Sequence, residues 1–280
     1  MLFFQKVPIE LIEKTSYNIT MKKFFMILIL VLTLTFAGCY YTINNQPDTS
    51  VNAPAPDYDT NSPEVDEEQE KKKYYAVSTT NSLRIRSGAG SSYGVVGYLD
   101  KNDAVLLIAE ENGYYKTTYK EKVAYVSKAY CTVMGIETAS ESKEKAIDLG
   151  CELLGYPYVW GSQRYHWGNG KLNTNFKKGE FDCSALVQYI YYKSNGSILA
   201  LTSRTQVNNG TEVLRNDLSR GDLMFFTNQS RQNKTGIERI GHVGIYLGNN
   251  YILHTASDHA VIEPISTQRW SYYITARRVV

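Results

Sequence analysis

Two histidines flank a predicted turn near the C-terminal end of the chain, and their spacing restricts how this segment can fold. His242 and His254 are twelve residues apart, and a Gly-Asn-Asn sequence at 248–250 lies between them. These three residues accept the positive φ angles of a tight hairpin turn. Because side chains alternate between the faces of a sheet, residues at an even separation share a face only if the loop has an odd number of residues. A three-residue loop at 248–250 meets that condition.

The predicted hairpin places the two imidazoles close together. A three-residue loop puts Leu247 opposite Tyr251 and Gly244 opposite His254. His242 is then the diagonal neighbour of His254, at a Cα–Cα distance of about 7 to 8 Å. Gly244 has no side chain, so it leaves room for the two rings to touch.

A cysteine at the start of an apolar run supplies a candidate nucleophile. Cys183 follows Asp182 and precedes residues 185–194, whose apolar spacing predicts a helix. The N-terminus of a helix favours an anion, so we expect a lowered pKa for the Cys183 thiol, and the same N–H groups could hold an oxyanion. On its position alone, a buried, inert cysteine is the favoured interpretation. With two neighbouring imidazoles to supply a base and an orienting group, Cys183 predicts a thiol hydrolase that cleaves amide bonds.

Composition limits the other classes of function. The 280 residues, 43% apolar and 21% charged, allow one or two domains with appendages. Removing the first 38 residues changes the formal net charge from +2 to zero, which gives no electrostatic case for nucleic-acid binding. The sequence has no Cys-x-x-Cys or His-x-His pair to suggest a metal site, and we expect no cofactor.

Residues 21–39 have the features of a bacterial lipoprotein signal. Two lysines precede the apolar stretch 24–37, which is too short to span a bilayer comfortably. Its end resembles a lipoprotein cleavage box, in which the following cysteine, here Cys39, receives diacylglycerol. We therefore expect residues 1–38 to be a signal segment, with Met21 as an alternative start, and Cys39 to anchor the chain to a membrane facing the cell wall. Ordinary secretion or a short membrane anchor is the alternative.

Residues 39–73 are predicted to be a disordered stalk behind that anchor. The segment contains four prolines, many polar residues and an acidic run at 64–70. Little in it could bury apolar area. Fully extended, it reaches at most about 110 Å, which suits a tether.

Residues 74–135 are predicted to form a small all-β barrel. Short alternating strands at 83–86, 95–97, 105–108, 113–116 and 123–126 are separated by turn residues. Their order resembles that of bacterial SH3 domains, with 83–90 similar to the opening motif of that family and 112–126 to its closing motif. The resemblance implies an SH3-like fold and, less strongly, contact with the cell wall or a stem peptide.

The remaining residues predict an α+β domain. Residues 141–154 and 185–194 have helical periodicity, and strands are expected at 223–226, 242–247, 251–254 and 274–280. A helical start followed by an antiparallel sheet is an α+β arrangement.

Residues 142–280 resemble the NlpC/P60 family of cell-wall cysteine peptidases. The matching stretches are 158–161, 182–186, 219–226, 241–248 and 276–279. The resemblance implies a papain-like fold in which Cys183 attacks, His242 is base and then acid, and His254 orients His242. It also implies a substrate, the peptide stem of peptidoglycan cut between D-γ-glutamyl and the diamino acid. The positions on the substrate side of the family's site are Tyr158, Asp182, Ser184 and Ser203.

Two departures from the family pattern concern the substrate side. Leu201 stands where the family usually has an arginine, and the segment 161–181 is longer than is common. That segment is basic, with Arg164 and three lysines against one glutamate. One hypothesis is a basic flap that meets stem-peptide carboxylates, and a solvated surface loop is the alternative.

The remaining cysteines and histidines are interpreted as structural. Cys131 and Cys151 could form a disulfide in an oxidising compartment, but the sequence does not give their distance, and we favour two buried thiols. His166 and His259 are interpreted as surface residues.

The sequence therefore predicts a membrane-tethered peptidoglycan endopeptidase. A thiol amidase that cuts between sugar and peptide is an alternative of the same chemical class. A wall-binding lipoprotein with an inactive site is an alternative of a different class, and the intact set of Cys183, His242 and His254 argues against it.

Overall fold

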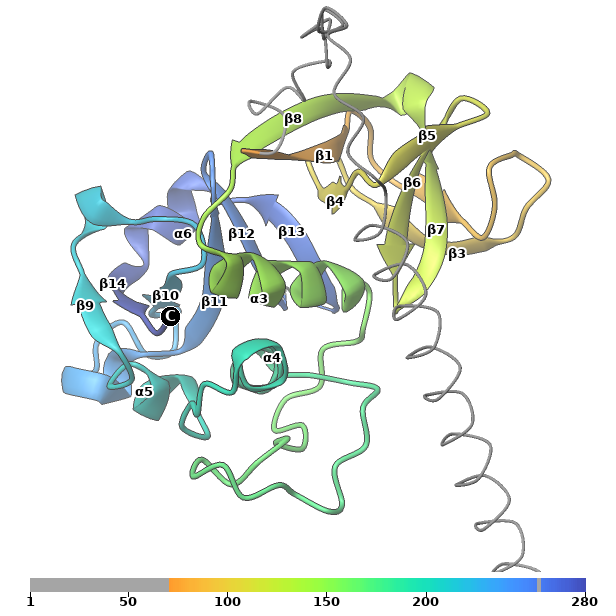
Figure 1. The fold of residues 1–280 in the computed structure, drawn as a ribbon. Coiled ribbons are helices and arrows are strands. Elements are labelled where there is room, and N and C mark those ends of the chain that lie inside the picture. The colour runs from red at the N-terminus through yellow and green to blue at the C-terminus, as the bar shows by residue number, and fades with distance from the viewer. Residues whose placement is uncertain (1–70, 256–257) are drawn as a thin grey trace, which may run out of the picture. The chain divides into compact units, whose positions relative to one another are not determined.

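The computed structural model describes residues 71–255 and 258–280, which form a β-rich N-terminal part and an α+β C-terminal part (Figure 1). The predicted signal segment 1–38 and the lipid site Cys39 lie outside the described residues, as does nearly all of the predicted stalk 39–73. No helix in the described ranges is long and apolar enough to cross a membrane. The predicted α+β class, with a smaller all-β part preceding it, is confirmed.

The N-terminal part consists of short strands in two antiparallel sheets. Their strand orders are β4-β1-β8 and β3-β2-β7-β6-β5. The strands are β1 (Lys72–Ser78), β2 (Leu83–Arg86), β3 (Val95–Leu99), β4 (Ala104–Leu106), β5 (Ala109–Glu111), β6 (Tyr114–Tyr119), β7 (Lys122–Ser127) and β8 (Cys131–Glu137). Lys72 and Lys73, which the sequence placed at the end of the stalk, lie in β1 opposite Glu137 and Ile136.

The C-terminal part combines helices with one antiparallel sheet of order β13-β12-β11-β10-β14-β9. Its helices are α3 (Glu141–Glu152), α4 (Cys183–Asn195), α5 (Ser203–Gln206) and α6 (Thr267–Ser271). Its strands are β9 (Thr211–Val213), β10 (Leu223–Phe226), β11 (His242–Gly248), β12 (Tyr251–Thr255), β13 (Ala260–Pro264) and β14 (Tyr273–Arg278). The two long helices and four of these strands were predicted, whereas β9, β13, α5 and α6 were not.

Helix α4 places the candidate nucleophile against the sheet. It packs on α3 and on strands β11 and β12 (Figure 1). Asp182 caps its N-terminus by accepting a hydrogen bond from the backbone N–H of Ala185, and Gly196, with φ of 76°, ends it. This cap makes Cys183 the first residue of α4, so the predicted position of the thiol at a helix N-terminus is confirmed.

The two parts share one hydrophobic core. Tyr75 and Tyr119 of the N-terminal part belong to the same cluster of buried side chains as Ile147 and Leu154 of the C-terminal part. The backbone N–H of Lys120, in the β6–β7 turn, donates to the carbonyl of Leu154 at 2.9 Å. The SH3-like part is therefore a structural support of the C-terminal part.

A buried arginine joins the two parts. Arg220, 5% exposed, donates through Nε and Nη2 to both oxygens of Glu144, at 2.6 and 3.0 Å. It also donates to the hydroxyl of Tyr75 at 2.8 Å and to the carbonyl of Leu247 at 2.9 Å. Burial raises the pKa of Glu144, but the hydrogen bonds and charge of Arg220 outweigh that effect and hold the pKa below its usual range. Arg220 is the largest of these stabilising contacts of the Glu144 carboxylate, and the backbone N–H of Ala139 and the charge of Lys73 act in the same direction.

Replacing Arg220 with methionine is expected to lower the stability of the whole folded unit. Removing one partner of a buried ion pair costs about 3 to 5 kcal/mol, and the lower end applies here because Nζ of Lys73, 3.3 Å from Oε2 of Glu144, still compensates part of the charge. In a protein of this size that corresponds to a fall in Tm of roughly 10 °C. Calorimetry checks the value, with the exposed Arg239→Met as the matched control. Equal Tm values for the two variants would contradict the assignment of Arg220 as a structural link.

Candidate active site

The hairpin that carries the two histidines differs in detail from the predicted one. Asn249 and Asn250, with φ of 48° and 64°, form a two-residue turn, and Gly248 lies opposite Tyr251. The pairing register shifts between β11 and β12 just before Gly248, which leaves Leu247 in a β-bulge. The predicted three-residue loop, with Leu247 opposite Tyr251, is therefore wrong. The bulge supplies the extra residue that the loop lacks, so the predicted parity of the two strands is preserved.

The two imidazoles contact one another, as the parity argument predicted. His242 Nε2 lies 2.8 Å from His254 Nδ1, and the ring centroids are 5.0 Å apart at an interplanar angle of 77°. A Cβ atom at Gly244 would lie 2.9 Å from the Cβ of His254 and 2.6 Å from Cδ1 of Ile252. Glycine is therefore required at position 244 for His254 to point at His242, and this prediction is also confirmed.

The sulfur of Cys183 lies beside the strand that carries His242. Cys183 is 9% exposed. Backbone hydrogen bonds from Val243, the residue after His242, and from Ser184 stabilise its thiolate form. Burial and the nearby Asp182 charge nevertheless raise the pKa of the thiol to about 11. The prediction of a lowered thiol pKa is therefore wrong, because desolvation outweighs the helix N-terminus.

Both imidazoles are held neutral. Burial, with the charges of His254 and Arg269, lowers the pKa of His242 well below its usual value. Burial also lowers the pKa of His254, against the opposing effect of Glu263. Near neutral pH the nucleophile is therefore a thiol beside an unprotonated base, and the thiolate forms only when that base takes the proton.

Glu263 is a functional candidate that the sequence analysis missed. It lies on β13, and its Oε1 is 2.9 Å from His254 Nε2 and 3.2 Å from Nη2 of Arg269. Burial raises the pKa of Glu263, but its bonds to these two residues outweigh burial and lower it. The short apolar run at 260–262 directly precedes Glu263, and Pro264 follows. This pattern was the available signal for a strand here.

The carboxylate of Glu263 determines which ring nitrogens carry protons. A carboxylate only accepts hydrogen bonds, so His254 Nε2 carries the proton that it donates to Glu263. In a neutral His254 the Nδ1 is then an acceptor, and it receives the proton of His242 Nε2. The remaining nitrogen of His242, Nδ1, is left with a free lone pair. This tautomer is the one that can act as a general base.

An open cavity of about 400 Å³ adjoins His242. It is lined mainly by polar side chains and contains one cationic group, Arg269. Tyr158, half-buried, also lines it, and Cys183 and Asp182 lie close enough to raise the pKa of Tyr158 further after burial. The lining residues are Tyr158, Phe226, Thr227, Asn228, Gly241, His242, Thr255, Ser266, Gln268, Arg269 and Tyr272.

The other predicted substrate-side residues lie around the first turn of α4. Asp182 and Ser184 are 6% and 4% exposed, and the Ser184 hydroxyl donates to Asp182 Oδ1 at 2.9 Å. Ser203 is the first residue of α5 and is 7% exposed. Gln206 of the same helix donates to the carbonyl of Ser184 at 2.9 Å. The structure thus brings these residues to one region, and their contact with substrate stays a prediction.

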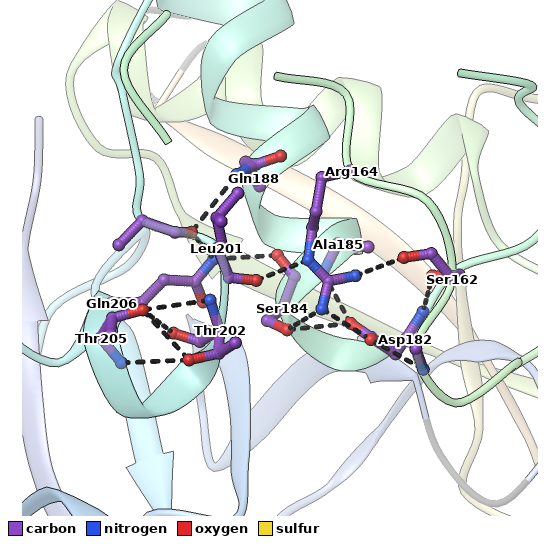
Figure 2. Close-up of polar contacts among 12 residues, drawn as sticks. Ser162, Arg164, Asp182, Ser184, Ala185, Gln188, Leu201, Thr202, Thr205 and Gln206 are labelled. Carbon is purple, nitrogen blue, oxygen red and sulfur yellow. Dashed lines mark hydrogen bonds and ion pairs between the residues drawn. The ribbon is translucent and has the colours of Figure 1, made fainter. Parts of the chain in front are cut away.

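The long segment 161–181 is anchored to α4 by aromatic packing. Tyr165, Phe176 and Phe181 surround Tyr189 of α4, with ring centroids 5.1, 5.7 and 5.5 Å away. Arg164 points inward, to the first turn of α4 (Figure 2). A flap built on Arg164 is therefore not supported, because that side chain is held against α4.

His166 and the cysteines outside the candidate site differ in their burial. His166 is fully buried, against its interpretation as a surface residue. Its Nδ1 accepts the backbone N–H of Gly168 at 3.0 Å, and its ring packs against Tyr192. Cys151 is a buried free thiol, as favoured, whereas Cys131 is free but only half-buried.

Known protein families match both parts of the chain. The NlpC/P60 family matches residues 155–279, and the bacterial SH3 domain matches residues 81–132. The two matches cover the candidate active site and most of the β-rich N-terminal part.

Three curated relatives illustrate the similarity. The peptidoglycan DL-endopeptidase CwlO of Bacillus licheniformis is 30% identical over 158 residues, which are 55% of this chain and 32% of that protein. The gamma-D-glutamyl-L-lysine dipeptidyl-peptidase of Bacillus subtilis is 31% identical over 168 residues, 59% of this chain and 49% of that protein. The murein DD-endopeptidase MepS/murein LD-carboxypeptidase of Escherichia coli K12 is 31% identical over 182 residues, 63% of this chain and 88% of that protein. The chain thus spans half or less of the first two relatives and most of the third.

Proposed function

This chain belongs to the NlpC/P60 family, and we propose that it hydrolyses an amide bond in the stem peptide of peptidoglycan, with Cys183 as nucleophile. The observation that carries the proposal is the hydrogen bond between His242 and His254 at 2.8 Å, beside a cysteine at a helix N-terminus. That bond orients the ring of His242 so that its Nδ1, which has a free lone pair, can accept the proton of the thiol. The residue roles follow from this geometry.

The reaction proceeds by acyl transfer through the sulfur. His242 Nδ1 takes the thiol proton as Sγ of Cys183 attacks the carbonyl carbon, and the same imidazolium then protonates the leaving nitrogen. The C–N bond breaks and a thioester forms. A water molecule, deprotonated by His242, attacks the thioester, the C–S bond breaks, and the thiol regains its proton. The free N–H groups in the first turn of α4 are the candidates for holding the oxyanion.

The bond that we propose is the one between D-γ-glutamate and the diamino acid. Support comes from the names of two relatives, a DL-endopeptidase and a gamma-D-glutamyl-L-lysine dipeptidyl-peptidase. The name of a third relative describes different bonds, DD and LD. The cavity beside His242, with Arg269 in its wall, suits a polar, anionic peptide.

Mass analysis of digested wall distinguishes the candidate functions. Incubation of purified peptidoglycan and of free stem peptides with the purified chain should release fragments that end in D-glutamate. Release of intact stem peptide from the sugar would instead indicate the amidase. Binding to the wall without any cleaved product would indicate an inactive wall-binding module. Either of the last two results contradicts the proposal.

The placement of the enzyme is a separate part of the proposal. A lipid on Cys39 and the stalk 39–73 would hold the catalytic part near the membrane, facing the wall. The support is the sequence of residues 21–39. Membrane fractionation of cells that express the wild type or Cys39→Ala tests it, and equal membrane retention of the two would contradict it.

Glu263→Gln is expected to lower kcat by roughly ten- to a hundredfold. The glutamine keeps the shape but removes the negative charge that stabilises the paired imidazoles when His242 accepts a proton. Steady-state kinetics on stem peptides measures the effect, and KM should change little because Glu263 acts through His254. The exposed Glu212→Gln is the matched control. A kcat equal to that of the control would show that Glu263 does not assist the histidine pair in catalysis.

A further inference from the structure

Arg164 joins three separate chain segments around the first turn of α4 (Figure 2). Its Nη2 donates to Oδ2 of Asp182 at 2.8 Å and to Oγ of Ser184 at 3.1 Å. Its Nη1 donates to the carbonyl of Ser162 at 2.6 Å, and its Nε donates to the carbonyl of Leu201. Of the five N–H donors of a guanidinium, four are occupied by these bonds.

The charge of Arg164 compensates a buried carboxylate. The side chains of Arg164 and Asp182 are 14% and 8% exposed. Asp182 also accepts hydrogen bonds from Ser184 and Ala185 on Oδ1 and from the backbone N–H of Gly161 on Oδ2. With Arg164, these bonds account for about four lone-pair sites of a carboxylate. Asp182 therefore has no free acceptor, and its negative charge depends on Arg164 for neutralisation.

This ion pair lies directly beside the nucleophile. Asp182 and Ser184 are the neighbours of Cys183 in the chain, and the sulfur must become negative when it attacks. The charge of Asp182 opposes that change and raises the pKa of Cys183, whereas the charge of Arg164 lowers it. An uncompensated Asp182 would make the attacking thiolate harder to form.

Arg164 also holds the segment that precedes α5. Leu201, whose carbonyl accepts the Nε proton, is the position at which the sequence departs from the arginine usual in the family. The neighbouring carbonyl of Ala200 accepts from Gln206 at 2.9 Å, and the same Gln206 amide donates to Ser184. The long segment 161–181 thus places the guanidinium of Arg164 against the backbone carbonyl of Leu201.

We propose that Arg164 is a positioning residue for Cys183, which neutralises Asp182 and fixes the first turn of α4 so that the sulfur can carry negative charge. This inference rests on the proposed function for its catalytic consequence, but its electrostatic part concerns the thiol alone. A direct role in substrate binding is a different function, and it would leave the thiol chemistry unaffected. The two roles are separated by measuring thiol ionisation and substrate kinetics in the same variants.

The test measures the pH dependence of Cys183 alkylation by iodoacetamide, followed at the level of the Cys183 peptide by mass spectrometry. In Arg164→Gln the midpoint should move to higher pH, with about tenfold slower alkylation at a given pH below it. In the double variant Arg164→Gln/Asp182→Asn the midpoint should return toward the wild-type value, because asparagine keeps the helix cap but not the charge. Arg164→Lys, which retains the charge, should keep the wild-type midpoint. Lys171→Gln, on the exposed face of the same segment, is the matched control.

Kinetics on stem peptides complete the test. Arg164→Gln should lower kcat about tenfold with KM within about twofold of wild type, because the residue acts through the nucleophile. An unmoved alkylation midpoint in Arg164→Gln, or a raised KM at unchanged kcat, would overturn the proposal. Alkylation requires no substrate, so a wild-type chain that fails to cut peptidoglycan would refute the proposed function while the alkylation shifts still decide the role of Arg164.

Discussion

Cys183→Ala is expected to reduce hydrolysis of stem peptides by at least about 10⁴-fold, to the background rate. The sulfur forms the covalent intermediate, and alanine offers no atom that can replace it. Because Cys183 is 9% exposed and removal of Sγ leaves a space of only one atom, the folded state should persist with a small loss of stability. Product release from stem peptides, followed by mass spectrometry over hours, measures the residual rate.

Cys131→Ala is the matched control for that experiment. Cys131 is a half-buried free thiol on β8, whose burial raises its pKa to about 11, so it shares the chemistry of Cys183 without the neighbouring histidines. Its removal should leave kcat unchanged. Cleavage by the Cys183→Ala variant at a rate within tenfold of wild type would show that the sulfur is not the nucleophile.

The contact between the two histidines could be predicted because it depends only on parity. An extra residue between two strands restores a shared face whether it sits in the loop or in a bulge. The sequence therefore predicted the contact of His242 and His254 correctly while misplacing the extra residue, which is Leu247. The choice between loop and bulge depends on how Asn249 and Asn250 twist the turn, which the spacing alone does not encode.

The ionisation of Cys183 could not be predicted from its position in the chain. The helix N-terminus is a local feature, and the sequence located it correctly at Asp182 and Cys183. Burial depends on the packing of α4 against β11 and β12, which are distant in sequence. Desolvation is the larger effect on the pKa of the thiol, so the local prediction had the wrong direction.

The positions of Glu263 and Arg164 beside the site also depend on contacts between segments that are distant in sequence. Glu263 reaches His254 because β13 pairs with β12, and Arg164 contacts Asp182, which lies eighteen positions later, after a stretch of irregular chain. A glutamate in a short strand and an arginine in a polar loop carry no local signal of these roles. Sequence reasoning therefore found the three groups proposed to perform the chemistry, missed Glu263, and assigned Arg164 to a basic flap instead of to its contact with Asp182.

His242→Ala is expected to make kcat/KM strongly dependent on pH, because the thiol and the imidazole are both neutral in the wild type. In the wild type, His242 must be unprotonated to accept the proton. Its pKa is held well below its usual value by burial, His254 and Arg269. The rate constant kcat/KM should therefore be nearly level from about pH 7 to about pH 10. Without His242, the sulfur must already be a thiolate when it attacks. With a thiol pKa of about 11, the thiolate fraction rises tenfold with each pH unit over the same range.

The ratio of wild-type to His242→Ala kcat/KM should consequently fall from about 10⁴ at pH 7 to about 10 at pH 10. The measurement is a pair of pH profiles on one stem peptide, with His259→Ala as the matched control because that half-exposed ring bonds Asp258 outside the site. The control should reproduce the level wild-type profile. Parallel profiles for wild type and His242→Ala would mean that the sulfur ionises without this imidazole, in which case His242 only shapes the site. A ratio that narrows tenfold per pH unit requires that His242 removes the proton during the attack, since no structural loss would depend on hydroxide concentration in that way.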